Sequence, residues 1–148
     1  MNKKNLLISA CLLGIPCRYD GKSVPRVAIS ALSEHFNLIP ICPEIYGGLP
    51  TPRTPSERLG DRVVMADGSD VTDNFIRGAE SAYLLATETN TTLALLKERS
   101  PSCGKGKIYD GSFTGKLADG DGYTAEYLSA RGIRIFGESE LDELIKLK

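Results

Sequence analysis

The sequence predicts an α/β protein of Rossmann-like type, in which a mostly parallel sheet is flanked by helices within a single domain spanning residues 1–148. Short apolar runs bounded by turn residues predict buried strands, and longer segments with apolar residues three and four positions apart predict helices. The two kinds of segment alternate along the chain. We therefore expect parallel strands connected by helices that cover the faces of the sheet.

The first half of the chain contains two predicted strands and one helix. Residues 4–10 form an apolar run followed by a Gly and Pro break, which predicts a buried strand. Residues 26–36 have near-helical apolar spacing after a proline that suits a first helical turn. Residues 38–41 are apolar and predict a second strand, although Pro40 cannot donate to a ladder. Residues 43–70 contain four prolines and four glycines and predict a long, functional loop.

The second half continues the alternation. Asp70 can cap a helix over residues 71–90, and residues 92–97 predict another buried strand. Residues 98–122 are dense in Gly, Ser and Asp, which indicates loops that could include a small hairpin. The remaining elements are a helix over 123–131 that ends at Gly132, a strand over 133–136, and a terminal helix over 138–148 capped by Ser139 or Glu138.

Composition limits the classes of partner. Hydrophobic residues make up 41% of the chain and charged residues 25%, as in globular proteins. A net charge of −1 provides no basic field for polymeric nucleic acid or an anionic membrane, and no apolar run is long enough to span a bilayer. The run before Cys11 ends like a lipoprotein cleavage site, but only Leu6, Leu7 and Ile8 precede that ending. This is too short for a signal peptide, so we expect a cytoplasmic location with reduced thiols.

Three of the four cysteines follow predicted strands. Cys11 and Cys42 each lie one residue beyond a predicted strand, and Cys103 lies six residues beyond the next one. Parallel strands end at one edge of the sheet, where such folds bind ligands, so these thiols should converge. No C-x-x-C pair is present, and the single histidine, His35, is predicted at the opposite end. Inert core cysteines, a metal or cluster site, and a thiolate nucleophile all remain open.

Polar residues near these thiols indicate a reaction site. Glu44 follows Cys42 by two residues and precedes two glycines that would let a backbone approach a ligand closely. Ser100 and Ser102 precede Cys103, and the backbone N–H groups of this segment could form a nest for sulfide or thiolate. Equally, Glu44 could be a solvated loop carboxylate and the serines could form turns. A dinucleotide fingerprint is absent, and residues 111–116 fall short of a P-loop.

Four blocks together resemble the DUF523 family, and they occupy most of the chain: residues 9–21, 42–53, 70–80 and 96–122. Members of this family include thiouracil desulfidases, which hold a [4Fe-4S] cluster with three cysteines and remove sulfur from thiolated pyrimidines. The resemblance implies the same small-molecule chemistry here, on a free base of 2-thiouracil type or a nucleoside of 4-thiouridine type.

The resemblance also implies residue roles. Cys11, Cys42 and Cys103 would hold the cluster, and Glu44 and Ser100 would form the catalytic pair. Cys17 would be a spare thiol or an alternative ligand. Residues beside the blocks that could orient the substrate are Arg18, Asp20, Arg53, Lys97 and Ser102. Two alternatives remain, a non-catalytic metal-binding or sulfur-carrier protein that uses the same thiols, and a protein whose cysteines only fill space.

Overall fold

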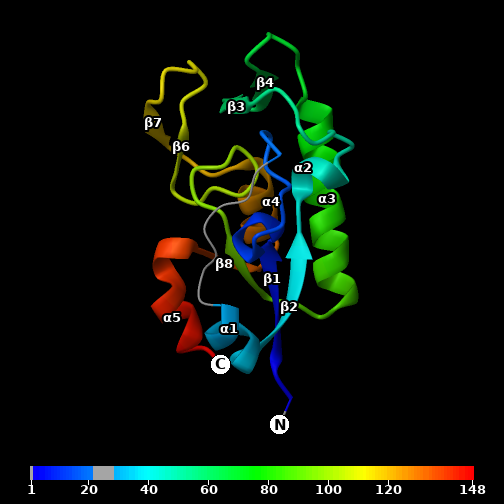
Figure 1. Cartoon of the computed structure of the whole chain (residues 1–148), viewed down its shortest axis with the longest axis vertical. Helices are drawn as coiled ribbons and strands as arrows, with labels where there is room; N and C mark the ends of the chain where they lie inside the picture. Colours follow the sequence, from blue (N-terminus) through cyan, green and yellow to red (C-terminus); the bar gives the residue numbers. More distant parts are fainter. Residues whose placement is uncertain (1, 22–28) are drawn as a thin grey trace.

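The structure is a computed structural model that describes residues 2–21 and 29–148. Within these residues, a four-stranded parallel sheet forms the centre, with the strand order β2-β1-β5-β8. Its strands are β1 (Lys4–Ser9), β2 (Phe36–Ile41), β5 (Leu93–Leu96) and β8 (Arg134–Gly137). The predicted α/β class with a parallel sheet is confirmed (Figure 1).

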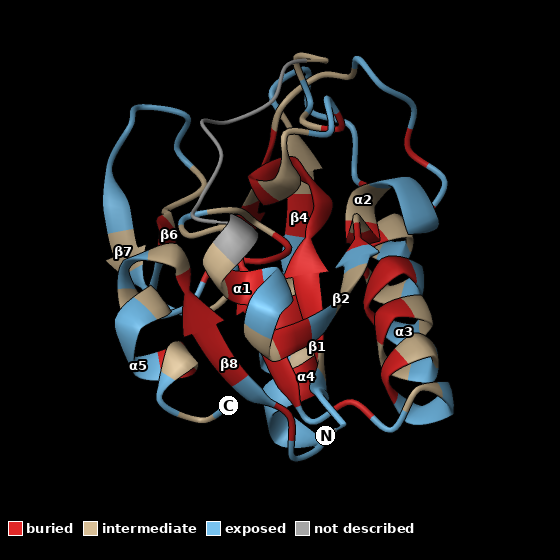
Figure 2. Ribbon diagram, turned by 60° about the horizontal axis from the view of Figure 1, so that its bottom comes forward, coloured by how far each residue is buried: buried red, intermediate tan, exposed pale blue. Residues whose placement is uncertain are grey.

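Helices cover both faces of this sheet. Alternate residues of a strand point to opposite faces, so Leu6 and Ile8 pack with α1 (Ile29–His35) and α5 (Leu141–Ile145). Leu7 packs on the other face with α3 (Thr72–Glu88) and α4 (Tyr123–Ala130). Because β1 and β5 are buried on both faces, they appear in the sequence as continuous apolar runs. The buried stripe of α3 faces the sheet while its outer side is exposed (Figure 2).

The strand order places the ligand edge. The chain moves from β1 outward to β2 and then returns to the other side of β1 as β5, so the order reverses between β1 and β5. In open α/β sheets, ligands bind just beyond the carboxyl ends of the strands at such a point. β2 is an edge strand, which explains why it tolerates Pro40 opposite Ile8.

The predicted long loop over residues 43–70 is wrong. It contains the short helix α2 (Pro43–Tyr46) and an antiparallel hairpin of β3 (Ser56–Leu59) and β4 (Arg62–Met65). Val63 of this hairpin packs with Phe75 of α3 in a separate small core. The signal that was missed is Gly60-Asp61, a two-residue hairpin connection with Gly60 at φ 62°. Each strand has only four residues, so its alternating pattern is too short to be recognised among the surrounding prolines.

Other element boundaries also differ from the prediction. Phe36 begins β2 instead of ending the helix predicted over 26–36, and the start of that helix lies outside the described residues. The terminal helix is a 3₁₀ turn, η2 (Glu138–Glu140), followed by α5 only as far as Ile145. Neither predicted cap is used. Instead the Glu140 carboxylate accepts a hydrogen bond from the Gly137 N–H at 3.0 Å.

Asp70 lies where a cap was predicted, and its Oδ1 accepts a hydrogen bond at 2.9 Å from the N–H of Thr72, the first residue of α3.

The small hairpin predicted within residues 98–122 is confirmed as β6 (Lys107–Tyr109) paired with β7 (Leu117–Asp119). Both hairpins lie at the end of the molecule to which β1 and β2 point, and both termini lie at the opposite end (Figure 1). None of the described helices is long and apolar enough to cross a membrane.

Candidate active site

A cavity of about 510 Å³ opens at the carboxyl edge of the sheet. Its walls come from the segments after β1, β2 and β5, together with β3 and the hairpin of β6 and β7. Nearly all the residues selected from the sequence line it, namely Cys11, Cys17, Arg18, Cys42, Glu44, Arg53, Lys97, Ser100, Ser102 and Cys103. Asp20 is not among the lining residues, and its carboxylate lies 3.9 Å from the Arg18 guanidinium.

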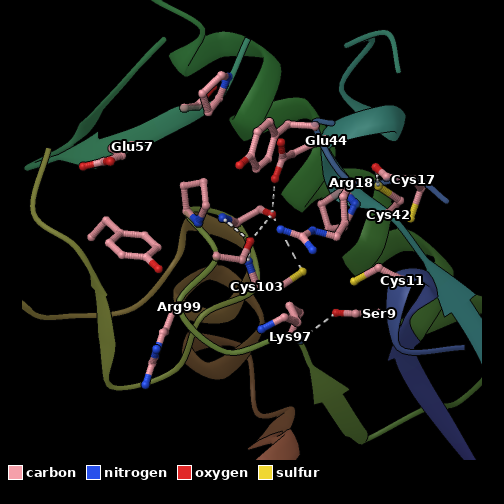
Figure 3. A pocket seen from close by; sticks show the side chains of 18 of the residues that line it. Ser9, Cys11, Cys17, Arg18, Cys42, Glu44, Glu57, Lys97, Arg99 and Cys103 are labelled. Carbon is pink, nitrogen blue, oxygen red and sulfur yellow. Dashed lines mark hydrogen bonds between the residues drawn. The ribbon is translucent and has the colours of Figure 1, made fainter. Parts of the chain in front are cut away.

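The three strand-end thiols come from three separate elements. Cys11 lies in a 3₁₀ turn, η1 (Ala10–Leu13), Cys42 immediately precedes α2, and Cys103 lies in the loop after β5. The sulfur atoms of Cys11 and Cys103 point toward the same space (Figure 3). Burial raises the pKa of the Cys103 thiol to about 12, while hydrogen bonds with Ser9 and Ser102 act in the opposite direction. All of these cysteines are free thiols, so the predicted convergence occurs without a disulfide.

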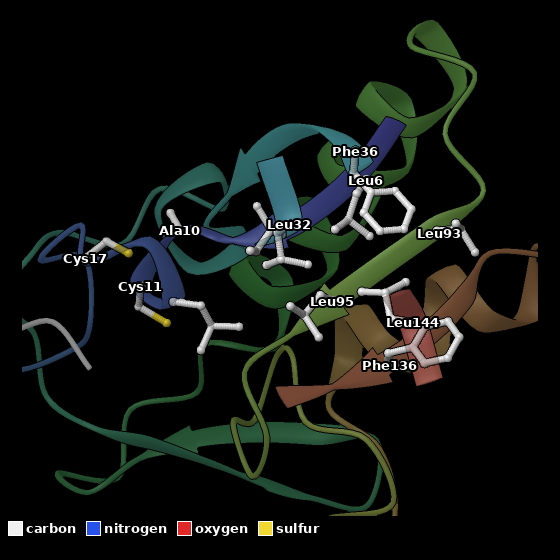
Figure 4. Packing of buried hydrophobic residues seen from close by; sticks show 12 residues of the cluster. Leu6, Ala10, Cys11, Cys17, Leu32, Phe36, Leu93, Leu95, Phe136 and Leu144 are labelled. Carbon is white, nitrogen blue, oxygen red and sulfur yellow. The ribbon is translucent and has the colours of Figure 1, made fainter. Parts of the chain in front are cut away.

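Cys17 lies between two of these thiols. Its pKa is raised, chiefly by its interaction with the Cys11 thiol and by burial, while the Cys42 thiol acts in the opposite direction. The Cys42 thiol in turn lies 3.8 Å from the Cys17 carbonyl oxygen, and its own pKa is raised by its hydrogen bond with Cys17 and by burial. Cys11 and Cys17 also belong to the hydrophobic cluster on the face of the sheet covered by α1 and α5, and their side chains lie at the border of this cluster (Figure 4). The fourth thiol is therefore part of the thiol group.

Glu44 is held from both sides. Its Oε1 accepts a hydrogen bond from Arg53 Nε at 3.0 Å, and its Oε2 accepts one from the Ser102 hydroxyl at 3.1 Å. The Arg53 side chain is only 3% exposed and also donates to the Cys17 carbonyl at 3.0 Å. Ser102 and Ser100 share a hydrogen bond of 3.0 Å between their hydroxyls. Ser102 therefore connects Glu44 to Ser100, a link that the sequence did not reveal.

Two backbone features predicted to face a ligand do not. Ser100 Oγ accepts hydrogen bonds from the N–H groups of Ser102 and Cys103, at 3.1 and 3.0 Å, so the expected nest is occupied by the protein itself. Gly47 lies against α3 instead of a ligand, since a Cβ there would stand 2.0 Å from the Asn74 carbonyl oxygen. Gly47 therefore serves the packing of α2 on α3.

The cavity also contains residues that the sequence had not selected. Ser9 Oγ accepts a hydrogen bond from the Lys97 N–H at 2.9 Å, which ties the ends of β1 and β5 together. The Lys97 ammonium lies 3.3 Å from Glu138. Further lining residues are Tyr19, Pro55, Ser56, Glu57, Glu98, Arg99, Tyr109 and Phe113. Ser9, Tyr19, Glu98, Arg99, Tyr109 and Phe113 lie inside the blocks that carry the family resemblance, which was the available signal for them.

The donor set suits an iron–sulfur cluster better than a single ion. Among the described residues, no three His, Cys, Asp or Glu side chains are grouped closely enough to hold one metal ion. A cluster is a larger body that separate thiolates hold at its corners, and three thiols from three elements that line one cavity match that requirement. His35 ends α1, just before the amino end of β2, and is remote from the thiols as predicted.

Thiols, a paired carboxylate and hydroxyls lie in one cavity, at the point where the strand order of a Rossmann-like sheet reverses. This combination defines an α/β enzyme with a thiol-rich active site. Comparison with known proteins agrees with this class. The chain belongs to the 2-thiouracil desulfurase family, whose model matches residues 6–140, and this confirms the resemblance seen in the sequence.

Two individual proteins match over nearly their whole length. The solved structure of the [4Fe-4S]-dependent thiouracil desulfidase TudS is 49% identical, with a TM-score of 0.92, over 96% of this chain and 95% of that chain. A protein of Bacillus subtilis (strain 168), the uncharacterized protein YbbK, is 39% identical over 150 residues, which cover 95% of this chain and 99% of the relative.

Proposed function

We propose that this protein is a [4Fe-4S]-dependent desulfidase that replaces the sulfur of a thiolated pyrimidine with oxygen from water. The observation that carries the proposal is the meeting of the Cys11, Cys42 and Cys103 thiols in one cavity with the Glu44 carboxylate. Family membership and the similarity to TudS support the same chemistry. The substrate would be a small molecule of 2-thiouracil or 4-thiouridine type. The need to keep the thiols reduced supports a cytoplasmic location.

Cys11, Cys42 and Cys103 would hold the cluster. Burial raises the pKa of the Cys103 thiol, so this thiol would lose its proton readily only on coordinating a cation. Such a site is suited to iron. When bound, the cluster would supply one iron without a protein ligand, which acts as a Lewis acid toward the soft sulfur of a thiocarbonyl group. Cys17 is left over by this assignment and would remain a neighbouring thiol.

The protein groups would handle water and protons. Glu44, oriented by Arg53, would accept a proton from the water that attacks the ring carbon. The hydroxyls of Ser102 and Ser100 provide a path of hydrogen bonds from this carboxylate along the cavity wall. A proton could pass along it to the substrate as the C–S bond breaks. The products are the carbonyl compound and hydrosulfide, and no net electron transfer is required.

Other charged side chains could orient the substrate. Arg18 and Lys97 line the cavity. The Arg18 guanidinium lies 3.9 Å from Asp20, and the Lys97 ammonium lies 3.3 Å from Glu138 and donates to the Glu98 carbonyl oxygen at 3.1 Å. Four hydrogen bonds, to Glu44 and to carbonyl and hydroxyl oxygens, engage the Arg53 guanidinium, so its role would be to position Glu44.

Anaerobic reconstitution with iron and sulfide tests the proposal. We expect about four irons per chain, and hydrosulfide release from 2-thiouracil or 4-thiouridine. Glu44→Gln should retain the iron and lose turnover by about 10²-fold or more, whereas Glu88→Gln, at the exposed end of α3, should match the wild type.

Each alternative predicts a different outcome. A chain that never takes up iron would exclude the cluster and favour cysteines that only fill space. A chain that takes up iron but releases no hydrosulfide would favour a metal-binding or sulfur-carrier protein. Full turnover by Glu44→Gln would show that another group is the base.

A further inference from the structure

The tip of the β6 and β7 hairpin places an aromatic residue, Phe113, at the wall of the cavity. The tip is closed by the Asp110 N–H, which donates to the Lys116 carbonyl oxygen at 3.0 Å. At its apex, Phe113 has φ 58°, a left-handed conformation that residues other than glycine seldom adopt. The residue is 36% exposed and lines the cavity. A bulky residue kept in a costly conformation at a cavity wall indicates a functional reason for its placement.

Glu57 holds this tip in place. Its Oε1 accepts hydrogen bonds from the N–H groups of Gly111 and Phe113, at 3.0 and 3.2 Å, across 54 and 56 residues of chain. Hydrogen bonds to an ionised carboxylate are stronger than those between neutral groups. Gly111 also lies so close to β3 that a Cβ there would stand 3.1 Å from the Leu59 Cβ. The backbone that leads into Phe113 is therefore fixed to β3.

The cavity separates this wall from the thiols. Figure 3 places Glu57 across the cavity from Cys17 and Cys42, which lie near α2. Tyr109 of β6 lines the cavity together with Phe113, so this wall carries two aromatic side chains. A pyrimidine whose sulfur reaches the thiols would extend toward that wall, and flat aromatic bases are held by stacking on such rings.

We propose that Phe113, positioned by Glu57, binds the ring of the substrate by stacking and so determines the preference for an aromatic thiocarbonyl compound. This inference rests on the proposed function, because it takes the substrate to be a thiolated pyrimidine. Phe113 is the group that contacts the ring. Glu57 is a positioning residue that acts only through the hairpin tip.

A double-mutant cycle on the reconstituted protein tests this inference, with KM, kcat and the dissociation constant for 2-thiouracil as readouts. Phe113→Ala should raise KM and the dissociation constant by about 5- to 100-fold, with kcat changed by less than about threefold. Phe113→Tyr keeps the ring and should stay near the wild type. Leu117→Ala, an exposed position on β7 of the same hairpin, serves as the matched control.

The Glu57 variants test positioning. Glu57→Ala should reproduce much of the Phe113→Ala effect, and the double variant should be no worse than Phe113→Ala, because both changes remove one interaction. Glu57→Gln keeps an oxygen acceptor and should restore most of the affinity. Iron content should be unchanged throughout. Multiplicative effects of the two alanine variants, or unchanged affinity in Phe113→Ala, would overturn the inference.

The binding readout separates this inference from the proposed function. The chain has no tryptophan, so Phe113→Trp introduces a single indole whose emission should change on addition of 2-thiouracil. Binding that depends on Phe113 without hydrosulfide release would refute the proposed function and uphold the aromatic wall. Hydrosulfide release with full affinity in Phe113→Ala would refute the wall alone. A wild-type protein that binds neither 2-thiouracil nor 4-thiouridine would refute both.

Discussion

Replacing Gly78 by alanine should destabilise the protein and disturb the active site from a distance. Gly78 lies on the face of α3 that contacts α2, and a Cβ there would stand 2.0 Å from the Pro43 carbonyl oxygen. Contacts of this kind below 3.0 Å are essentially never observed, so the two helices would have to separate by about 1 Å. The atom in the way belongs to the backbone and cannot swing aside.

The magnitude follows from opposing terms. Alanine is favoured over glycine inside a helix by about 1 kcal/mol. Overpacking costs about 1–3 kcal/mol, and separation of the helices would also weaken the bond of 2.9 Å from Asn74 Nδ2 to the Gly47 carbonyl, worth about 1 kcal/mol. We therefore expect Gly78→Ala to lower the free energy of unfolding by about 1–3 kcal/mol. Because α2 carries Glu44 and directly follows Cys42, turnover should fall as well.

Urea unfolding of the metal-free protein measures the first effect. Glu80→Ala, at an exposed position of the same helix, is the control and should stay within about 0.5 kcal/mol of the wild type. A Gly78→Ala protein that is more stable than the wild type by the full helix preference would refute the reasoning, because it would show that α2 and α3 tolerate a side chain between them.

Two further predictions concern the thiols and a helix end. In the metal-free protein, mild oxidation with peroxide should join Cys17 to Cys11 or Cys42 and consume two of the four thiols, whereas Cys17→Ser should keep its three. Equal losses in both proteins would contradict the placement of Cys17 next to these thiols. The hydrogen bond from the Gly137 N–H, together with Lys105, lowers the pKa of Glu140. The stabilisation that ionised Glu140 provides is therefore complete above its unfolded-state pKa of about 4.3, and it is lost as the pH falls through the lower folded-state pKa. Stability of Glu140→Gln should therefore fall less steeply in that range, and an acid-unfolding profile parallel to the wild type would exclude this role.

Local sequence patterns were sufficient to predict the parallel sheet and the edge of the sheet at which the thiols lie. The strand predicted over 92–97 has its four apolar residues, Leu93–Leu96, buried on both faces, and their short run between turn residues identifies a strand without tertiary information. Once strands alternate with helices, the edge at which Cys11, Cys42 and Cys103 meet follows from the direction of the chain. The same patterns failed over residues 43–70, where strands of four residues are too short for periodicity to stand out among prolines.

The sequence by itself therefore determined the fold class, the ligand edge and the set of thiols and carboxylate that occupies it. Only the tertiary structure decided which of these groups touch. The bond between Ser102 and Glu44 spans 58 residues and the bond between Glu57 and Phe113 spans 56, and each depends on how loops and hairpins pack over the sheet. Periodicity reports which face of an element is buried. It carries no information about which distant side chain will meet that face, because that choice is made by the packing of the whole chain.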